Sequence, residues 1–344
     1  MTKSKIFAVT SAFVLVATSL PAQQTSVTIN SFGGAYETAH RKCVIDPFEK
    51  ATGAKVNIVT AYSADAFAQL RAQKAAPQYD VIHFSGGQEI VGAKEGLLAP
   101  IDAAKIPNLV DIYDFAKAKL AAGEGPAYSI AAIGLVYAAD KSPKAPSKWT
   151  DLADPAYAEH LVLTDISNGY GMLSFLMLNK VMGGDLANLQ PGLDAIKAML
   201  DAGAIVVSKS PEIQQEFAQN DAWVAPYASD YAFTLKKAGL DAKFVQGAEG
   251  TPASFITANL VAGRPNTDLA LKLIDMTISK EAQTCFANEL RYTPTNSKVE
   301  LAPDVAADVV YGEKSAAGLI RFDPTVIEAN RSAWVEAWNK TIGR

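Results

Sequence analysis

The stretch SVTINSFGGAYETAHRKCVIDPFEKATG, residues 26–53, contains the structural unit from which most of this chain is built. Residues 26–30 have the alternation typical of a β-strand, and Gly33 and Gly34 predict a tight turn directly after it. A helix is expected over residues 35–50. It should end before Gly53, because glycine readily adopts the left-handed conformation of a helix C-terminus. The local order is strand, turn, helix.

This order recurs through the first hundred residues. Strands are expected over residues 55–60 and 79–85, and a second helix is expected with Ser63 as its N-cap residue. Gly86 and Gly87 follow the strand at 79–85 and predict another turn into a helix. Strands that alternate with helices typically form a parallel sheet covered by helices, so the expected fold class is α/β.

A second unit occupies the middle of the chain, between long apolar strands over residues 129–140 and from residue 253 onward. Shorter elements alternate between them, with strands at 160–165, 204–207 and 222–226 and helices at 172–182, 190–201 and 211–219. Further helices are expected over residues 268–289 and 324–340. We therefore expect two domains joined by crossover strands.

Residues 1–22 have the layout of a secretory signal peptide. Lys3 and Lys5 precede an apolar run over residues 6–16, and Ala22 offers a small residue for cleavage before Gln23. The alternative, a permanent membrane anchor, is disfavoured because the apolar run is too short to span a bilayer. The cleavage site has no cysteine for lipid attachment. We expect the chain from residue 23 onward to be exported.

Two cysteines, Cys43 and Cys285, lie far apart in the sequence. In a cytosolic protein they would be read as small buried hydrophobic residues. In an exported protein an even pair is more often a disulfide, which is the interpretation that we favour. Such a bond would tie the first helix to a helix near the C-terminus.

Composition and motifs favour binding over catalysis. The chain is 49% hydrophobic and 19% charged, with a formal charge of −5, which argues against nucleic acid or an anionic membrane as its partner. It has no nucleophile elbow, phosphate-binding loop, zinc-protease helix or paired-cysteine zinc motif. The three histidines, His40, His83 and His160, are interpreted as packing or surface residues. No catalytic residue, metal or cofactor is predicted.

A series of short motifs resembles the extracellular solute-binding proteins of bacterial ABC transporters, specifically the spermidine/putrescine-binding branch. The motifs span nearly the whole chain in order: SFGGAY at 31–36, PFEKATG at 47–53, YDVI at 79–82, GLVY at 134–137, WTDL at 149–152, YASD at 227–230 and YTPTN at 292–296. The resemblance implies a two-lobed type II periplasmic-binding-protein fold, each lobe a mainly parallel sheet flanked by helices. It also implies lobes that close on a small ligand and deliver it to permease subunits in the inner membrane. A monomer is expected because lobe closure needs free faces, and the signal peptide places it in the periplasm.

The resemblance and the order of elements divide the chain into four parts. Residues 1–22 are the signal peptide, residues 23–130 the first part of lobe 1, and residues 131–255 lobe 2. Residues 256–344 are expected to return to lobe 1, with C-terminal helices that pack on the lobes or the hinge.

The expected ligand differs from that of the polyamine binders. Those proteins place several carboxylates around the ammonium groups, because a buried charge needs an opposite charge beside it. Here Asp230 alone is retained clearly, while Gly33 and Gly34 stand where an acid is expected. A small amine-bearing or zwitterionic solute, such as an amino acid or a γ-amino acid, therefore fits better. The turn glycines offer amides to its carboxylate and the tyrosines can contact its amine.

Two alternatives concern the function of the whole chain. An exported enzyme on the same scaffold would have Cys43 as its candidate nucleophile, and a ligand sensor would present its closed form to a receptor. At the residue level, the glycines and tyrosines can serve turns and packing only, and Asp230 can be a surface helix cap. The predicted ligand-binding residues are Ser31, Phe32, Gly33, Gly34, Tyr36, Tyr62, Ser85, Gly86, Asn168, Tyr170, Tyr227, Ser229, Asp230, Phe255 and Thr257.

Overall fold

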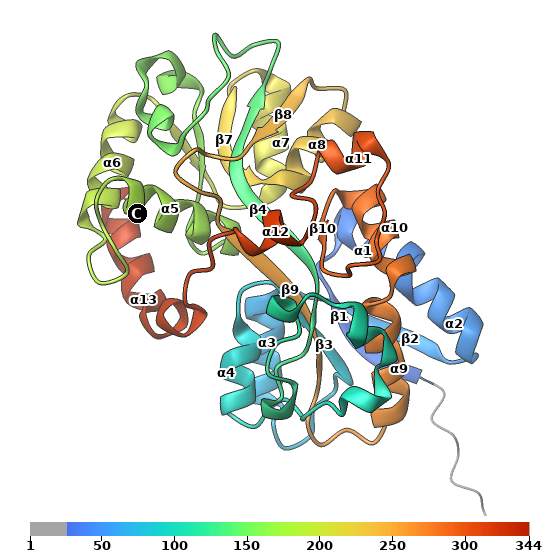
Figure 1. The fold of residues 1–344 in the computed structure, drawn as a ribbon. Helices are drawn as coiled ribbons and strands as arrows, with labels where there is room; N and C mark the ends of the chain where they lie inside the picture. Colours follow the sequence, from blue (N-terminus) through green and yellow to red (C-terminus); the bar gives the residue numbers. More distant parts are fainter. Residues whose placement is uncertain (1–25, 344) are drawn as a thin grey trace, which may run out of the picture.

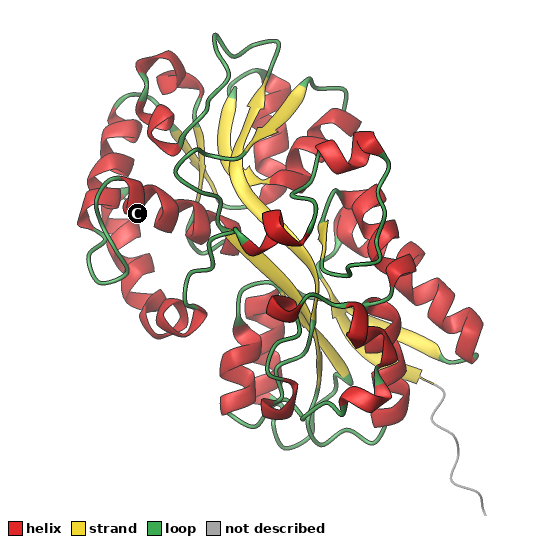
Figure 2. Ribbon diagram, viewed as in Figure 1, coloured by secondary structure: helices red, strands yellow, loops and turns green. Residues whose placement is uncertain are grey.

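The computed structural model describes residues 26–343, and the signal peptide predicted over residues 1–22 lies outside this range. The chain forms two α/β lobes (Figures 1 and 2). Two long strands run through both lobes: β4 (Ala127–Ala138) and β9 (Ala253–Leu260). They are paired antiparallel and buried over their whole length, because each strand has neighbours on both sides and apolar side chains on both faces.

Lobe 1 contains the strand-turn-helix repeats of the N-terminal part. Strands β1 (Ser26–Ser31), β2 (Lys55–Thr60) and β3 (Val81–Phe84) are parallel, in the order β2-β1-β3, and β9 joins β3 in the antiparallel direction. Helices α3 (Ser63–Ala72) and α4 (Gln88–Lys94) lie beside this sheet, as expected for a parallel sheet whose connections are helices.

The first helical segment is continuous but not uniform. It consists of α1 (Gly34–His40), a π-helical turn (Arg41–Ile45) and α2 (Asp46–Thr52), and it ends at Gly53, which has φ +71°. The predicted start of α3 was wrong by one residue. Tyr62 is the N-cap, and the Ser63 hydroxyl instead accepts a hydrogen bond from the Ser85 amide at 2.9 Å.

Lobe 2 is formed around the C-terminal half of strand β4. Strands β7 (Val224–Ala228) and β8 (Ala242–Val245) pair antiparallel with β4, and β5 (Val162–Thr164) pairs parallel with β6 (Ile205–Val207). Strand β8 was not predicted. The helices of this lobe are α5 (Gly169–Val181), α6 (Gln190–Asp201), α7 (Ser210–Gln219) and α8 (Ser229–Lys237).

The helix predicted over residues 268–289 is in fact two helices. Helix α9 (Thr267–Thr277) ends before Ser279, whose hydroxyl accepts a hydrogen bond from the Ala282 amide and so caps α10 (Lys280–Leu290). Strand β10 (Thr293–Pro294) and helices α11 (Pro303–Ala307), α12 (Glu313–Ala317) and α13 (Pro324–Thr341) follow. Short 3₁₀ segments cover Ala103–Lys105, Pro107–Asp111, Asp114–Ala116, Leu120–Ala122, Trp149–Ala153 and Pro155–His160.

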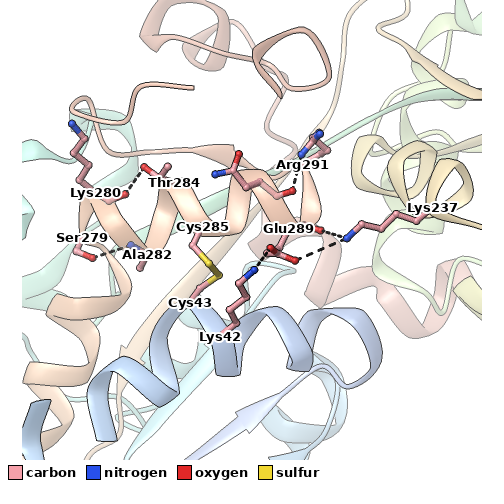
Figure 3. The surroundings of a disulfide bond; sticks show 11 residues. Lys42, Cys43, Lys237, Ser279, Lys280, Ala282, Thr284, Cys285, Glu289 and Arg291 are labelled. Carbon is pink, nitrogen blue, oxygen red and sulfur yellow. Dashed lines mark hydrogen bonds and ion pairs between the residues drawn. A yellow bond between two sulfur atoms is a disulfide. The ribbon is translucent and has the colours of Figure 1, made fainter. Parts of the chain in front are cut away.

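The predicted disulfide is present. Cys43, on the π-helical turn, is bonded to Cys285 on α10, across 242 residues of sequence (Figure 3). Beside it, Lys42 Nζ lies 2.5 Å from Glu289 Oε1, and Lys237 of α8 lies 4.0 Å from the same carboxylate. The bond therefore fastens the first helical segment to the part of the chain that returns from lobe 2.

The C-terminal helix α13 contacts both lobes. Its Trp338 is fully buried and packs against Phe175 of α5, while its N-terminal end lies on α4. Figure 1 shows α13 beside α5 and α6, next to the gap between the lobes. Between residues 26 and 343, no helix combines the length and the apolar character needed to cross a membrane.

Candidate functional site

The lobe 1 side of the site begins where strand β1 ends. Phe32 follows the strand, and its ring lies 4.6 Å from the ring of Tyr36 on α1. Tyr36 is buried, and its hydroxyl forms a short hydrogen bond with the Tyr128 hydroxyl of β4. The carboxyl end of a parallel strand is the usual ligand-binding edge of an open α/β sheet, so these side chains lie where a ligand is expected.

The lobe 2 side is organised by Asn168 and Tyr227. The Asn168 side chain caps α5, with Oδ1 accepting hydrogen bonds from the amides of Tyr170 (2.9 Å) and Gly171 (3.4 Å). Its Nδ2 lies 3.5 Å from the Tyr227 hydroxyl, which is 2.5 Å from Ser210 Oγ. The ring of Tyr227 contacts the rings of Tyr170 and Tyr231.

Asp230 lies in the first turn of α8, directly after β7. Its Oδ1 atom is buried and has no hydrogen-bond partner in the protein. Burial raises the pKa of Asp230 from its ordinary value to about 7, and a hydrogen bond from its own backbone amide offsets this only in part. An unpaired carboxylate in such surroundings is ready to accept a cationic group.

Tyrosines from several elements surround Asp230. We call Tyr36, Tyr128, Tyr170, Tyr227, Tyr231 and Tyr292 the tyrosine cluster. Burial raises the pKa of Tyr170 and Tyr292 well above the ordinary value, and the Asp230 charge raises both further. Tyr36 of lobe 1 acts electrostatically on both. The tyrosine cluster therefore contains residues of both lobes.

A second group of predicted residues lies around a small cavity. Ser85, Gly86 and Phe255 line a cavity of about 40 Å³ together with Gly169 and Arg321. The Arg321 guanidinium lies 4.5 Å above the Phe255 ring and 3.5 Å from the carboxylate of Glu89, whose pKa is raised to about 7 by burial.

The remaining predicted residues have different surroundings. Gly33 and Gly34 have positive φ at the start of α1, and Ser31 is buried with a hydroxyl that lacks a partner. Tyr62 is 63% exposed, although its hydroxyl is near enough to act electrostatically on Tyr231. Thr257 is buried in β9 and accepts a hydrogen bond from Asn259 Nδ2 at 2.9 Å.

Ser229 is directed away from the predicted arrangement. It is buried and lines a separate cavity of about 410 Å³ with Lys236, Lys243 and Asp308. Successive residues of a helix face different sides, so Asp230 and its neighbour Ser229 contribute to different surroundings.

Four residues of this region were not predicted: Tyr128, Ser210, Tyr231 and Tyr292. The YTPTN motif contained Tyr292, and Tyr231 follows Asp230, so both had a weak signal in the sequence. Tyr128 and Ser210 had none, because each reaches the cluster through tertiary packing alone. Among residues 26–343 there is no group of three or more His, Cys, Asp or Glu side chains that could hold a metal ion.

The family model for bacterial extracellular solute-binding proteins matches residues 44–311, which is most of the chain. The chain belongs to this family. The resemblance inferred from the short motifs is thereby confirmed, and the type II fold, the two lobes and the role in solute binding for an ABC transporter agree with it.

Individual relatives are similar to this chain in sequence or in fold. This solute-binding protein is 25% identical over 286 residues to the gamma-aminobutyric acid-binding protein of Pseudomonas aeruginosa, covering 80% of this chain and 78% of that one. A Clostridium perfringens ABC transporter structure matches with a TM-score of 0.74 at 24% identity, covering 92% of this chain and 99% of that one. The structure of the GABA receptor Atu4243 also matches with 0.74, at 19% identity, covering 92% and 97%.

Proposed function

We propose that this solute-binding protein captures a small zwitterion with one ammonium group, such as γ-aminobutyrate or another amino acid, in the periplasm. It would deliver the solute to the permease of an ABC importer. The observation that carries this proposal is the buried Oδ1 atom of Asp230, which has no hydrogen-bond partner in the protein and lies near four tyrosines.

The ammonium group would pair with Asp230. A buried carboxylate is stabilised by an opposite charge at short range, and tyrosine rings attract cations through their faces. Burial raises the pKa of Tyr170, Tyr227, Tyr231 and Tyr292, and the Asp230 charge raises it further. With one carboxylate acting on these four tyrosines, a single ammonium group would be matched and a polyamine would not.

The carboxylate of the ligand would face lobe 1. Ser31 has a buried hydroxyl without a partner at the end of β1, and the chain then turns through Gly33 and Gly34 into the first helical segment. The first amides of a helix have no partner within the helix and favour an anion. A buried hydroxyl and the amides of a helix start would suit the carboxylate of a zwitterion whose ammonium group pairs with Asp230.

Two further observations support this reading. One curated relative, at 25% identity, is named for binding γ-aminobutyric acid, and the related structure of Atu4243 is titled a GABA receptor. Cys43, the candidate nucleophile of an enzymatic alternative, is engaged in the disulfide with Cys285 and is not a free thiol. Both favour transport of an amine-bearing solute over catalysis.

Isothermal titration calorimetry tests the proposal with γ-aminobutyrate, other amino acids, putrescine and spermidine. We expect binding of a zwitterion and no binding of spermidine. The substitution Asp230→Asn should weaken that binding by at least about 30-fold, since an unpaired ligand charge would remain in the site. Asp275→Asn, which removes a partly buried acid on α9, should leave it unchanged. Tight binding of spermidine, or full affinity in the Asp230→Asn protein, would contradict the proposal.

A further inference from the structure

Helix α10 lies against two helices that carry predicted ligand-binding residues. It packs on α1, which carries Tyr36, and on α8, which carries Asp230. The helix ends at Leu290, and two residues later the chain reaches Tyr292 of the tyrosine cluster. A displacement of α10 would therefore move Tyr292 and change the packing around Tyr36 and Asp230.

One side of the first helical segment is in contact with α10. The ring of Tyr36 is stacked on the ring of Phe286 with centroids 6.1 Å apart, and the ring of His40 lies 6.0 Å from that of Phe286. About one turn further along, Cys43 is bonded to Cys285, and their Cα atoms are 5.4 Å apart (Figure 3). The disulfide thus fixes the distance between the two segments beside the contact that holds the Tyr36 ring.

The Tyr36 ring connects this contact to the rest of the candidate site. It lies 6.4 Å from the ring of Tyr292, and its hydroxyl is hydrogen-bonded to the Tyr128 hydroxyl of β4. The ring of Tyr128 in turn lies 5.6 Å from that of Phe286. These four aromatic side chains form one buried group, and Phe286 follows the bonded cysteine directly.

The other contacts between the two segments constrain their positions less. Lys42 and Glu289 form an ion pair at 2.5 Å, but the Lys42 side chain is 64% exposed, and exposed ion pairs contribute little. The packing of Phe286 is apolar and non-directional, so it tolerates small displacements. A covalent bond, in contrast, sets a fixed distance.

The local conformation at Cys43 points in the same direction. Cys43 lies in the π-helical turn Arg41–Ile45, between the α-helical segments α1 and α2. Single π-helical turns inside α-helices are frequent at functional sites. The turn adds a residue relative to a regular α-helix and so changes the direction in which the following side chains project.

We propose that the Cys43–Cys285 disulfide positions Tyr36 and Tyr292 for ligand binding, in addition to stabilising the fold. The inference rests on the proposed function, because it concerns residues of the same candidate site. Loss of the bond allows α10 and the first helical segment to shift relative to each other, so that the tyrosine rings occupy several arrangements. A site that the ligand must first order binds more weakly than a preorganised one.

Calorimetric titration of the oxidised and the reduced protein tests this inference. Dithiothreitol cleaves the disulfide to two thiols and is itself oxidised to a cyclic disulfide. Cys285 lines an open hollow at the surface, where the reagent can reach the bond. At a temperature at which circular dichroism shows both forms to be folded, reduction should weaken the binding of γ-aminobutyrate, or of the amino acid that binds, by at least about tenfold. Reoxidation should restore it.

A variant without the disulfide separates the bond from other effects of the reductant. The double substitution Cys43→Ala and Cys285→Ala should weaken binding to a similar extent as reduction. Its affinity should be the same with and without dithiothreitol, because it has no bond to cleave.

Arg264→Ala is the matched control for a loss of stability alone. Arg264 Nε lies 2.8 Å from Oδ1 of Asp80, which is buried, so the substitution leaves that carboxylate without its ion-pair partner and destabilises the protein. Asp80 directly precedes β3 and therefore lies at the opposite edge of the parallel sheet from the residues that follow β1. Arg264→Ala should leave the affinity unchanged, and urea unfolding confirms its lower stability.

The outcomes are distinct. Weaker binding by the reduced protein, with unchanged binding by Arg264→Ala, supports the inference. Unchanged affinity after reduction, or an equal loss in Arg264→Ala, overturns it. If no solute of the panel binds the oxidised protein, the proposed function fails, and hydrogen exchange of the ligand-free protein decides the positioning role. Faster exchange of α1 and of residues 291–296 after reduction, but not in Arg264→Ala, supports that role, and unchanged exchange overturns it.

Discussion

The indole Nε1 of Trp338 donates a hydrogen bond to Asp165 Oδ2 at 3.3 Å, across 173 residues of sequence. Trp338 is fully buried on the C-terminal helix, and Asp165 follows strand β5 in lobe 2, where it also accepts hydrogen bonds from Ser167. The contact attaches α13 to lobe 2, while the other end of α13 lies on α4 of lobe 1.

Two substitutions of Trp338 should therefore destabilise the protein to different extents. Trp338→Phe keeps most of the apolar volume but removes the indole N–H, and should lower the free energy of unfolding by about 1–3 kcal/mol. Trp338→Ala also leaves a cavity, and should lower it by about 3–5 kcal/mol. Urea unfolding measures both. Trp223→Phe, which removes an indole hydrogen bond to Asn220 near the surface, is the matched control and should change it little. Equal effects at the two tryptophans would contradict this role of Trp338.

The Cys43–Cys285 disulfide should contribute substantially to stability, because it closes a loop of 242 residues in the unfolded chain. Reduction, or the double substitution Cys43→Ala and Cys285→Ala, should lower the free energy of unfolding by about 2–4 kcal/mol. Urea unfolding with and without dithiothreitol measures the effect. The double variant serves as the control, since its stability should not respond to the reductant. A wild type that unfolds identically with and without reductant would argue against the bond.

Gly87 should be essential for the position of α13. It has φ +83°, and a Cβ atom there would lie 2.0 Å from Cβ of Pro324, the first residue of α13. Gly87→Ala should therefore displace the start of the helix and increase hydrogen exchange along it. Gly53 provides the control, because it also has positive φ but a Cβ there would meet nothing within 4 Å. Gly53→Ala should cost about 1–2 kcal/mol of backbone strain without affecting α13. Equal exchange in the two variants would refute the prediction.

The buried histidines should make the protein sensitive to acid. His40 and His83 pack edge to face at 4.8 Å, and none of their ring nitrogens has a hydrogen-bond partner. Burial lowers the pKa of His83 to about 3 and holds the pKa of His40 well below its ordinary value. The unfolded chain then binds protons below about pH 6.5 that the folded state does not bind, so each histidine lowers stability as the pH falls.

The comparison between variants isolates this effect, because the raised pKa values of Asp230 and Glu89 act in the opposite direction. Between about pH 6 and pH 4, His83→Leu should lose less stability than the wild type, by about 1.4 kcal/mol per pH unit. Urea unfolding at several pH values gives the two slopes. Phe286→Leu changes a non-titrating neighbour of His40 and should lower stability equally at every pH. An unaltered slope in His83→Leu would show that His83 is protonated in the folded state.

Much of the fold could be read from local pattern. The strand predicted at residues 55–60 and the helix at 190–201 have the same limits in the structure, because each has a regular period of apolar residues and a clear end signal. The prediction of one helix over residues 268–289 was wrong because its apolar pattern continues through Ser279. The break there depends on a single hydroxyl cap. Strand β8 was missed because its residues are only partly buried and lack a strong alternation.

Part of the candidate site could likewise be predicted from the sequence, and part could not. Asp230 and Tyr227 could be proposed from the YASD motif through its resemblance to the family, and Asn168 from its place in a turn before a helix. The residues that contact them could not be proposed from the sequence. Tyr128 lies within an apolar strand, Ser210 begins a helix in another part of lobe 2, and Tyr292 follows α10, so nothing local marks them as neighbours.

By itself the sequence determined the α/β class, the crossover strands, the cysteine pair and the acid of the candidate site, since these depend on periodicity, composition and short motifs. The tertiary structure alone decided that Asp230 Oδ1 is buried without a hydrogen-bond partner, that tyrosines distant in sequence lie near it, and that α13 contacts both lobes. Burial and pairing arise between residues distant in sequence, whereas propensity and pattern act over only a few neighbouring positions. The electrostatic surroundings of Asp230 therefore form only when the chain folds.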